Sequence, residues 1–499
     1  MSLDVAADIV LLLCAAIAAG GAYVFHSRGK RAAAVICVLV VAISLRLHVG
    51  RDRYLHAWDE RYHVLVAKNL VSDPLRPALY AAVPLPYDFR DPFANHVWLH
   101  KPPLALWLMA ASMRLFGVNE AAARLPSLVV SGLAVLATYG IGRTLFDESV
   151  AVLAAGLLAV NGFVLDLAGG RVADDHVDTL LIGLVVLGCW MSFRYTSRPT
   201  WWRVVAIGVC TGLAVLTKSL VALLIPLVWL AVVWPLNARG TVLSRLGVIL
   251  MVAAWVSVPW EIFTRASYPK EAAWEASYIF RHLVEPLQGH AGPWYEYLVG
   301  LGRFHGELVY IPIAWFVIVN GAGRFRAWGL LAWLAVPYLA FSAAETKMPA
   351  YVSVAAPAVC LIAAAFWCHL DRRAKTWKDE QGKRLLAAAL LGLLLVLPLR
   401  YTAERLRVLH PKLEREPAWA RDLKAISLTL GQERAVIVND PWFIETMFYT
   451  AALAYPQDLG ASQAAELAQR GYHVYRLRGD MSLESLAQPG LSASNVRDR

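Results

Sequence analysis

Apolar residues along this 499-residue chain gather in long runs that are separated by short polar loops. Most runs are roughly 17–25 residues long, the length that an α-helix needs to cross a bilayer. The pattern predicts an all-α, polytopic membrane protein with about 12–13 spans. The candidate spanning helices are 7–25, 32–48, 124–142, 149–167, 176–193, 203–217, 219–236, 243–262, 306–322, 326–344, 348–369 and 384–400.

The composition agrees with this pattern. Hydrophobic residues make up 58% of the chain, the mean hydropathy is +0.50, and only 17% of the residues are charged. Soluble globular domains carry about 25% charged residues. These numbers exclude an ordinary soluble protein.

The basic residues predict an orientation in the membrane. A net charge of +10 alone would suggest a nucleic-acid partner. Most of the basic clusters, however, lie in short loops between apolar runs, and alternating the helices puts them all on one face. That is the positive-inside pattern, so we expect this face to be cytoplasmic and expect no binding of nucleic acid. The clusters lie at 28–31, 143, 194–203, 239–245, 324–326 and 372–384.

The opposite face receives two long loops, 49–123 and 263–305. Within the first, the segment 101–117 resembles a further span, but its apolar part is short and Arg114 interrupts its end. Counting it as a span would invert all later basic loops. We therefore predict a helix that lies flat in the membrane interface.

The chain changes character after residue 400. The segment "RAVIVND" predicts a strand, "PWFIETMFYTAALAY" a helix opened by proline, and "GYHVYRLR" a second strand. The sequence thus predicts a transmembrane domain over 1–400 and a small extracytoplasmic α/β domain over 401–499.

Charged residues cluster where the first outer loop leaves the membrane, in "AWDERYHVLVAKNL". Asp59 and Glu60 are adjacent carboxylates there, and Arg61 and Tyr62 follow. A helix cap or a solvated turn would explain them equally well. Long, aromatic-rich loops inside compact proteins are more often functional than disordered, however, and carboxylates beside aromatic rings are common in sugar-binding sites.

Other outer-face residues each allow two interpretations. Asp178 lies at a helix start, where an acid favours the helix dipole whether or not it has a further role. Lys347 and Tyr351 are placed at the depth of a lipid phosphate, but a tyrosine there is also an ordinary interface anchor. Lys218, between two apolar runs, could simply extend to the interface.

The second outer loop carries Arg281, His282 and His290, which could bind an anion or form a solvated surface. The two histidines have no regular metal-ligand spacing. All six cysteines lie within apolar runs, which argues against a disulfide framework or a zinc site. The residues by themselves therefore leave ligation of a metal by the two histidines open.

Several segments together resemble the polyprenyl-phosphate-dependent glycosyltransferases of the GT-C fold. The similarity is greatest to the group that contains the bacterial aminoarabinose transferases of lipid A and the protein O-mannosyltransferases, glycosyltransferase families 83 and 39. It extends over most of residues 50–365, in the family's order. The segments are "WDERYHVLVAKNL", "LHKPPLALWLMAASMRLFGVNEAAARLPS", "GRTLFDESVAVLAAGLL", "GRVADDHVDTLLI", "GLAVLTKSLVALLIPLVWL", "HLVEPLQGHAGPWYEYL" and "ETKMPAYVSVAAPA".

The resemblance implies a monomeric enzyme of the bacterial cytoplasmic (inner) membrane with its active site on the periplasmic face. It would move a sugar from a polyprenyl-phosphate donor to a lipid, glycan or protein acceptor, without a cofactor and without a metal. Carried over residue by residue, it implies Asp59 as general base beside Glu60, and Lys101, Tyr351, Lys347 and Arg281 as ligands of the donor phosphate. The implied substrate-binding residues are Arg61, Tyr62, His282, His290 and Asp178.

Two other functions compete with this one. A transporter or flippase of lipid-linked glycans usually shows paired repeats and ionisable residues inside its spans. We find no internal repeat, and the spans are nearly free of charge. A non-catalytic scaffold carrying an extracytoplasmic domain is the third possibility, which the tail alone would allow.

Overall fold

A computed structural model covers the whole chain and describes residues 3–91, 94–320, 325–377, 380–407, 414–431 and 433–489. The chain divides into two compact units. Unit 1 comprises Met1–Arg51, Lys101–Ala105 and Arg124–Leu413, and unit 2 comprises Asp52–His100, Leu106–Ala123 and Glu414–Arg499. The domain boundary at residue 400 rests on sequence composition and stays a prediction.

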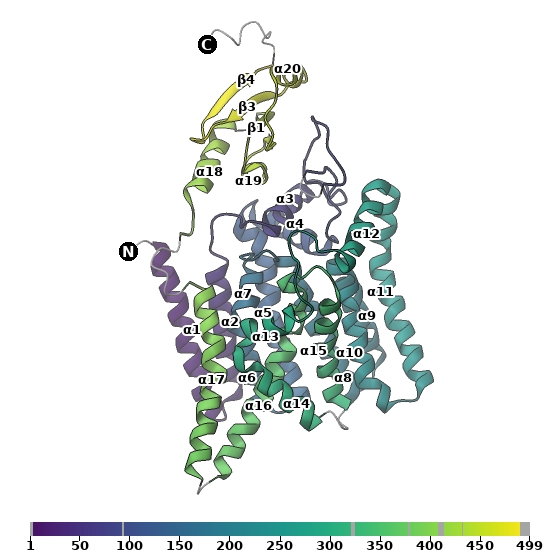
Figure 1. Cartoon of the computed structure of the whole chain (residues 1–499), viewed down its shortest axis with the longest axis vertical. Helices are drawn as coiled ribbons and strands as arrows, with labels where there is room; N and C mark the ends of the chain where they lie inside the picture. Colours follow the sequence, from purple (N-terminus) through teal and green to yellow (C-terminus); the bar gives the residue numbers. More distant parts are fainter. Residues whose placement is uncertain are drawn as a thin grey trace. The chain divides into compact units, whose positions relative to one another are not determined.

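Unit 1 is a bundle of helices (Figure 1). Its first helices are α1 (Leu3–Ser27), α2 (Arg31–Val49), α5 (Glu120–Leu145, from Arg124 on), α6 (Glu148–Ala159), α7 (Gly162–Ala168), α8 (His176–Ser197), α9 (Trp201–Lys218), η1 (Ser219–Leu223), α10 (Leu224–Val233) and η2 (Trp234–Leu236). The later ones are α11 (Arg239–Ser267), α12 (Pro269–Val284), α13 (Glu296–His305), η3 (Glu307–Val309), α14 (Tyr310–Asn320), α15 (Phe325–Ala343), η4 (Pro349–Ala355), α16 (Ala356–Thr376) and α17 (Gln381–Arg405).

The bundle packs around large apolar side chains. Trp229 on α10 and Trp333 on α15 are fully buried in its main core. Small residues let the helices approach closely: a Cβ added at Gly188 of α8 would lie 2.6 Å from the side chain of Ile225 on α10. All six cysteines, which fall in the described ranges, are free, as the sequence predicts.

Among the described residues, eight helices are long and apolar enough to cross a membrane, or nine if the bent pair α6–α7 is one span. The predicted spans nevertheless fall largely on helix; the span 306–322 does so up to Asn320, and residues 321–322 lie outside the described part. The run 201–236 counts once, although it contains both α9 and α10. The elements η3 and α14 together make a shorter apolar helix, and α15 is not among the eight. The protein is thus a polytopic, mostly helical membrane protein, as predicted.

Two breaks interrupt the spans of unit 1. The axes of α6 and α7 meet at 55°, and the side chain of Asn161 caps α7 by accepting a hydrogen bond from the Val164 backbone N–H at 3.0 Å. Ser219 has a φ of 40°, in the left-handed region that non-glycine residues rarely adopt. This residue ends α9 and starts the turn into α10.

Unit 2 combines the first outer loop with the tail. Its elements are α3 (Asp59–Leu70), α4 (Leu104–Phe116, from Leu106 on), α18 (Ala418–Leu430), β1 (Ala435–Val438), α19 (Phe443–Tyr449), β2 (Leu453–Ala454), α20 (Ala461–Gln469), β3 (His473–Leu477) and β4 (Leu483–Ala487). The described part of the tail holds a four-stranded sheet in the order β2-β1-β3-β4. Strand β1 pairs in parallel with β2 and β3, and β4 runs antiparallel to β3.

The structure confirms the small α/β tail and corrects one of its elements. The helix predicted over 441–455 ends at Tyr449, and Leu453–Ala454 forms β2 instead. The reason is pairing: Val436 of β1 lies opposite Leu453, and all of β1 is buried. Segment 101–117 contains only the 13-residue α4, too short to span a bilayer, as predicted.

Candidate functional site

Four polar side chains of unit 1 form what we call the lysine cluster: Lys101, Asp178, Lys218 and Tyr351. The Lys218 Nζ lies 2.6 Å from Asp178 Oδ1, and the Asp178 side chain is almost fully buried. The same Nζ lies 5.0 Å from the centre of the Tyr351 ring. Lys101 acts electrostatically on both Asp178 and Tyr351. The structure thus groups three of the predicted site residues with a lysine that was not predicted.

The local backbone places these groups at element ends. Asp178 lies in the first turn of α8, whose N-cap residue Asp175 accepts a hydrogen bond from the Val177 N–H at 3.1 Å. Lys218 is the last residue of α9, immediately before the left-handed Ser219. Backbone strain of this kind costs about 1–3 kcal/mol and concentrates at functional sites.

A second carboxylate fixes the segment that carries Tyr351. Asp174 Oδ2 accepts a hydrogen bond from the Ala350 N–H at 3.1 Å, which ties the start of η4 to the segment preceding α8. Tyr351 follows by one residue. The lysine cluster is therefore assembled by contacts between segments about 180 residues apart in sequence.

The chemistry of the cluster suits an anion. A buried ion pair is seldom retained for stability, because desolvating two charges offsets most of their attraction. Here Asp178 faces two ammonium groups, Lys218 and Lys101, and two further buried carboxylates, Asp174 and Asp175, act on the same cluster. The two lysines and the nearby phenol supply the hydrogen-bond donors that a phosphate monoester or diester requires.

Segment 345–347 pairs with the second outer loop of unit 1. The backbone N–H of Lys347 donates to the His290 carbonyl at 2.8 Å, and that of Thr346 donates to the His282 carbonyl at 3.1 Å. The Lys347 Nζ donates to the carbonyls of Ser342 at 3.1 Å and of Ala344, at the end of α15. Lys347 thus caps a helix, while its role as a phosphate ligand remains a prediction.

The other predicted residues of this loop have local partners. Arg281 forms an ion pair with Glu285 one helical turn away, with Nη2 and Oε2 2.7 Å apart, and both side chains are at least one-third exposed. Hydrogen bonding to Glu285 raises the pKa of Arg281. A ring nitrogen of His282 lies 3.0 Å from the Tyr278 carbonyl oxygen. Arg281 and Lys101 both act electrostatically on Tyr278, and the role of Arg281 as a phosphate ligand stays a prediction.

Unit 2 holds the residues around Asp59. Asp59 begins α3 and is partly exposed, and His63 follows it by one turn on the same face of the helix. A carboxylate oxygen of Asp59 and a ring nitrogen of His63 lie within 4.8 Å of each other. This pair offers a base with a neighbouring proton carrier, and it also offers two ligand atoms to a divalent metal.

Glu60 points into a buried network of unit 2. Its Oε2 accepts a hydrogen bond from the His56 backbone N–H and lies 2.6 Å from the His56 Nδ1. The other ring nitrogen of His56 lies 3.1 Å from Asp52, which pairs with Arg415 at 2.6 Å. These contacts give Glu60 a structural role in fixing the start of α3, so we keep Asp59 alone as the candidate base.

The tail contacts α3 near the start of that helix. Arg61 Nη1 lies 3.2 Å from Glu445 Oε1 on α19, and Arg61 also lies over the ring of Tyr62. Burial raises the pKa of Glu445, and burial likewise raises the pKa of Asp440. The two predicted substrate-binding residues, Arg61 and Tyr62, thus contact each other and the tail domain.

The tail also contacts α3 near the end of that helix. The Lys68 Nζ donates to the carbonyls of Met447 at 2.6 Å, Phe448 at 3.0 Å and Thr450 at 2.7 Å. The last carbonyls of a helix lack hydrogen-bond donors within the helix, and the Lys68 ammonium group is the donor for those at the end of α19. Together, Arg61 and Lys68 hold the helix that carries Asp59 at both ends.

Sequence reasoning missed Lys218, Lys68 and Glu445 as parts of these sites. Lys218 gave one signal: a lysine between two apolar runs needs a buried partner if it does not reach water. Lys68 and Glu445 gave none, since each meets a partner more than 370 residues away.

The comparisons with known proteins agree with the resemblance seen in the sequence. Residues 100–263 match the family described as dolichyl-phosphate-mannose-protein mannosyltransferase. An undecaprenyl phosphate-alpha-4-amino-4-deoxy-L-arabinose arabinosyl transferase of Pseudomonas fluorescens is 29% identical over 51% of this chain and 47% of its own. A transferase with the same description from Pseudomonas savastanoi is 26% identical over 60% and 56%. The chain spans about half the length of the curated relatives it matches.

Two solved structures share the fold. ArnT from Cupriavidus metallidurans, bound to undecaprenyl phosphate, matches with a TM-score of 0.67 at 16% identity, over 91% of this chain and 96% of that one. The archaeal oligosaccharyltransferase AglB from Archaeoglobus fulgidus matches with a TM-score of 0.57 at 13% identity, over 92% and 74%. The chain therefore has the GT-C fold, and the predicted resemblance to the protein mannosyltransferase and aminoarabinose transferase group is confirmed, with its family match over residues 100–263.

Proposed function

We propose that this protein is a membrane glycosyltransferase that moves a sugar from a polyprenyl-phosphate donor to a hydroxyl or phosphate acceptor. The observation that carries the proposal is the lysine cluster on a GT-C fold: two lysines and a tyrosine grouped around buried Asp178, with Asp174 and Asp175 beside them. A solved protein of this fold binds undecaprenyl phosphate, and curated relatives are described as using an undecaprenyl-phosphate sugar.

In this proposal Lys101, Lys218 and Tyr351 hold the phosphate of the donor. Sugar transfer breaks the bond between the anomeric carbon and the phosphate oxygen, and both bonding electrons leave with the phosphate. The two ammonium groups stabilise the negative charge that develops there. A lipid phosphate is a good leaving group, so the reaction needs no separate acid.

We further propose that Asp59 takes the proton of the acceptor hydroxyl while the acceptor oxygen bonds to the anomeric carbon. In the proposed orientation the reaction takes place on the periplasmic face of the bacterial inner membrane, opposite the basic loops. The acceptor class, whether lipid, glycan or protein, and a monomeric state are parts of the proposal that follow from the resemblance.

Binding of undecaprenyl phosphate to the purified full-length protein tests the donor site. Lys101→Met should weaken binding about tenfold or more, the value of one charge-assisted contact, and Tyr351→Phe should weaken it less. Lys383→Met is the matched control, because Lys383 forms an exposed ion pair with Glu380 on α17. Equal binding by all four proteins would overturn the assignment of the donor phosphate to the lysine cluster.

A further inference from the structure

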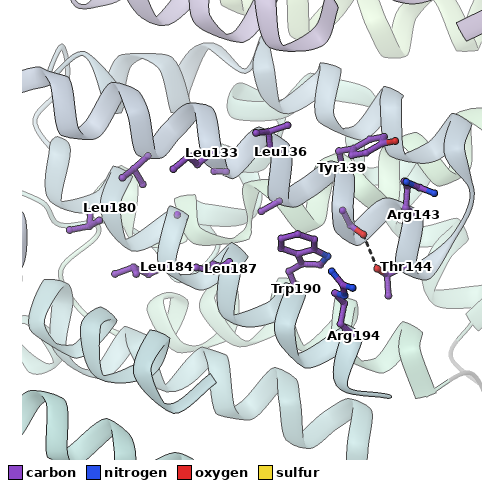
Figure 2. A pocket seen from close by; sticks show the side chains of 15 residues that line it. Leu133, Leu136, Tyr139, Arg143, Thr144, Leu180, Leu184, Leu187, Trp190 and Arg194 are labelled. Atoms are coloured by element: carbon purple, nitrogen blue, oxygen red, sulfur yellow. Dashed lines mark hydrogen bonds between the residues drawn. The ribbon is translucent and has the colours of Figure 1, made fainter. Parts of the chain in front are cut away.

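A groove with a volume of about 860 Å³ lies between α5 and α8 in unit 1. Figure 2 shows that leucines of both helices line one part of it, and that two arginines, Arg143 and Arg194, lie together at one end. The leucines are Leu133, Leu136, Leu180, Leu184 and Leu187. The groove therefore has a long apolar part and a short basic end.

Two glycines make room for side chains of the facing helix in this groove. A Cβ added at Gly140 of α5 would lie 2.6 Å from the Trp190 ring of α8, and one at Gly183 of α8 would lie 2.3 Å from the Val130 side chain of α5. Both distances are shorter than any normal contact. Trp190 and Val130 therefore lie against the facing helix at these glycines, and the leucines line the rest of the groove.

The basic end carries charge that is available to a ligand. The guanidinium of Arg194 lies 5.5 Å from the centre of the Trp190 ring, is exposed, and pairs with no carboxylate in the described part of the chain. Arg143 lies 5.8 Å from the Tyr139 ring and pairs with Glu148 at 3.2 Å, with its side chain still half exposed. The buried Trp190 Nε1 has no hydrogen-bond partner within the described ranges.

This basic end is far from the lysine cluster. Asp178 and Arg194 are 16 residues apart on the single helix α8. At 1.5 Å per residue they are separated by about 24 Å along the helix axis, most of the thickness of a bilayer core. An anion bound at Arg194 therefore has its charge in the opposite leaflet from an anion bound at Lys218.

We propose that the groove binds an anionic phospholipid, with an acyl chain along the leucines and the phosphate on Arg143 and Arg194. Charge complementarity selects this occupant, since the two arginines form a basic end to an otherwise apolar channel. The isoprenoid chain of a polyprenyl-phosphate donor does not meet this requirement, because its phosphate belongs at the far end of α8. By the positive-inside pattern the lipid comes from the cytoplasmic leaflet. This exclusion of the donor rests on the proposed function, whereas the two arginines and the apolar channel do not depend on it.

Native mass spectrometry of the full-length protein with added phosphatidylglycerol or phosphatidylcholine tests this site. Replacing both arginines, Arg143→Ala with Arg194→Ala, should weaken phosphatidylglycerol binding by about fivefold per arginine and leave phosphatidylcholine binding unchanged. The control pair is Arg28→Ala with Arg31→Ala, which removes two basic residues on the same predicted face, one from the turn after α1 and one from the start of α2. It should leave both lipids bound as in the wild type.

A second variant tests the groove rather than the charge. Leu133→Trp fills the apolar part at an exposed position, so it should reduce phosphatidylglycerol binding without unfolding the bundle. Three results would each overturn the proposal: an equal loss in the control pair, equal dependence of phosphatidylcholine binding on the arginines, or displacement of phosphatidylglycerol by undecaprenyl phosphate. If the proposed transfer reaction fails while lipid selectivity holds, this inference survives.

Discussion

Replacing Lys68 with methionine should release the tail from the helix that carries Asp59. The Lys68 Nζ donates three hydrogen bonds to the end of α19, at 2.6–3.0 Å. Methionine keeps most of the apolar stem but offers no donor. The three carbonyls at the end of α19 then lose their shared partner, and the contact between α3 and α19 is left with the Arg61–Glu445 ion pair and the apolar packing of the two helices.

The size of the effect follows from these contacts. A hydrogen bond to a charged group contributes about 1.5–3 kcal/mol, but three bonds to one ammonium are not additive. Burial lowers the pKa of Lys68 to about 8, which shows that desolvation offsets part of the gain. We therefore expect the free energy of opening α19 away from α3 to fall by about 3 kcal/mol, or about 100-fold in the opening equilibrium.

Hydrogen–deuterium exchange measures this opening directly. In Lys68→Met, the amides of α19 should exchange about 100-fold faster than in the wild type, while those of the buried helix α8 should be unchanged. Lys383→Met, which removes an exposed lysine from α17, should change neither. Unchanged exchange in α19 would refute the idea that Lys68 holds the tail on α3.

Three further predictions concern the ion pairs and the candidate metal ligands. Lys218→Met should destabilise unit 1 by about 3–5 kcal/mol because it leaves Asp178 buried without its partner, and adding Asp178→Asn should recover part of this in a thermal-unfolding assay. Burial raises the pKa of Glu445 above 4.5. The folded state then binds this proton more tightly than the unfolded state, so the contribution of Glu445 to stability is full below pH 4.5 and is lost as the pH rises through the folded pKa. Glu445→Gln should therefore reduce the change of the unfolding free energy with pH in this range. Treatment with EDTA should leave sugar transfer unchanged, although Asp59 and His63 could supply two ligands.

Each of these three predictions has a clear contrary result. A double variant no more stable than Lys218→Met would argue against a direct pair with Asp178. An unchanged pH slope in Glu445→Gln would assign the titration to other groups, Asp440 first. Loss of transfer in EDTA that Mn²⁺ or Mg²⁺ restores would make Asp59 a metal ligand rather than a base.

The helices could be predicted from the sequence because a membrane span depends on local apolarity. The turn between 217 and 219 was visible as a polar break, and the structure places the left-handed Ser219 there. Short pairing elements could not be predicted in the same way. Strand β2 is only two residues long, and its pairing with β1 overrides a helical pattern that continues past Tyr449.

The residues of the candidate sites also differ in whether local sequence could identify them. Asp178 and Tyr351 were named from their positions at helix starts, and both belong to the lysine cluster. Lys218 was considered only as a lysine that extends to the interface, because its partner Asp178 is 40 residues earlier and only the packing of α8 on α9 brings them together. Lys347 has the depth expected of a phosphate ligand, but its ammonium group caps α15.

The level of polyprenyl-phosphate sugars in cells tests the central claim most directly. Mass spectrometry of lipids from a deletion strain should show a polyprenyl-phosphate sugar that accumulates, and a plasmid carrying the wild-type protein should clear it. A plasmid carrying Asp59→Asn, made at the same level and folded, should fail to clear it. Clearance by the asparagine variant would remove Asp59 as the base, and a deletion strain with no accumulated donor would contradict the proposed transfer itself.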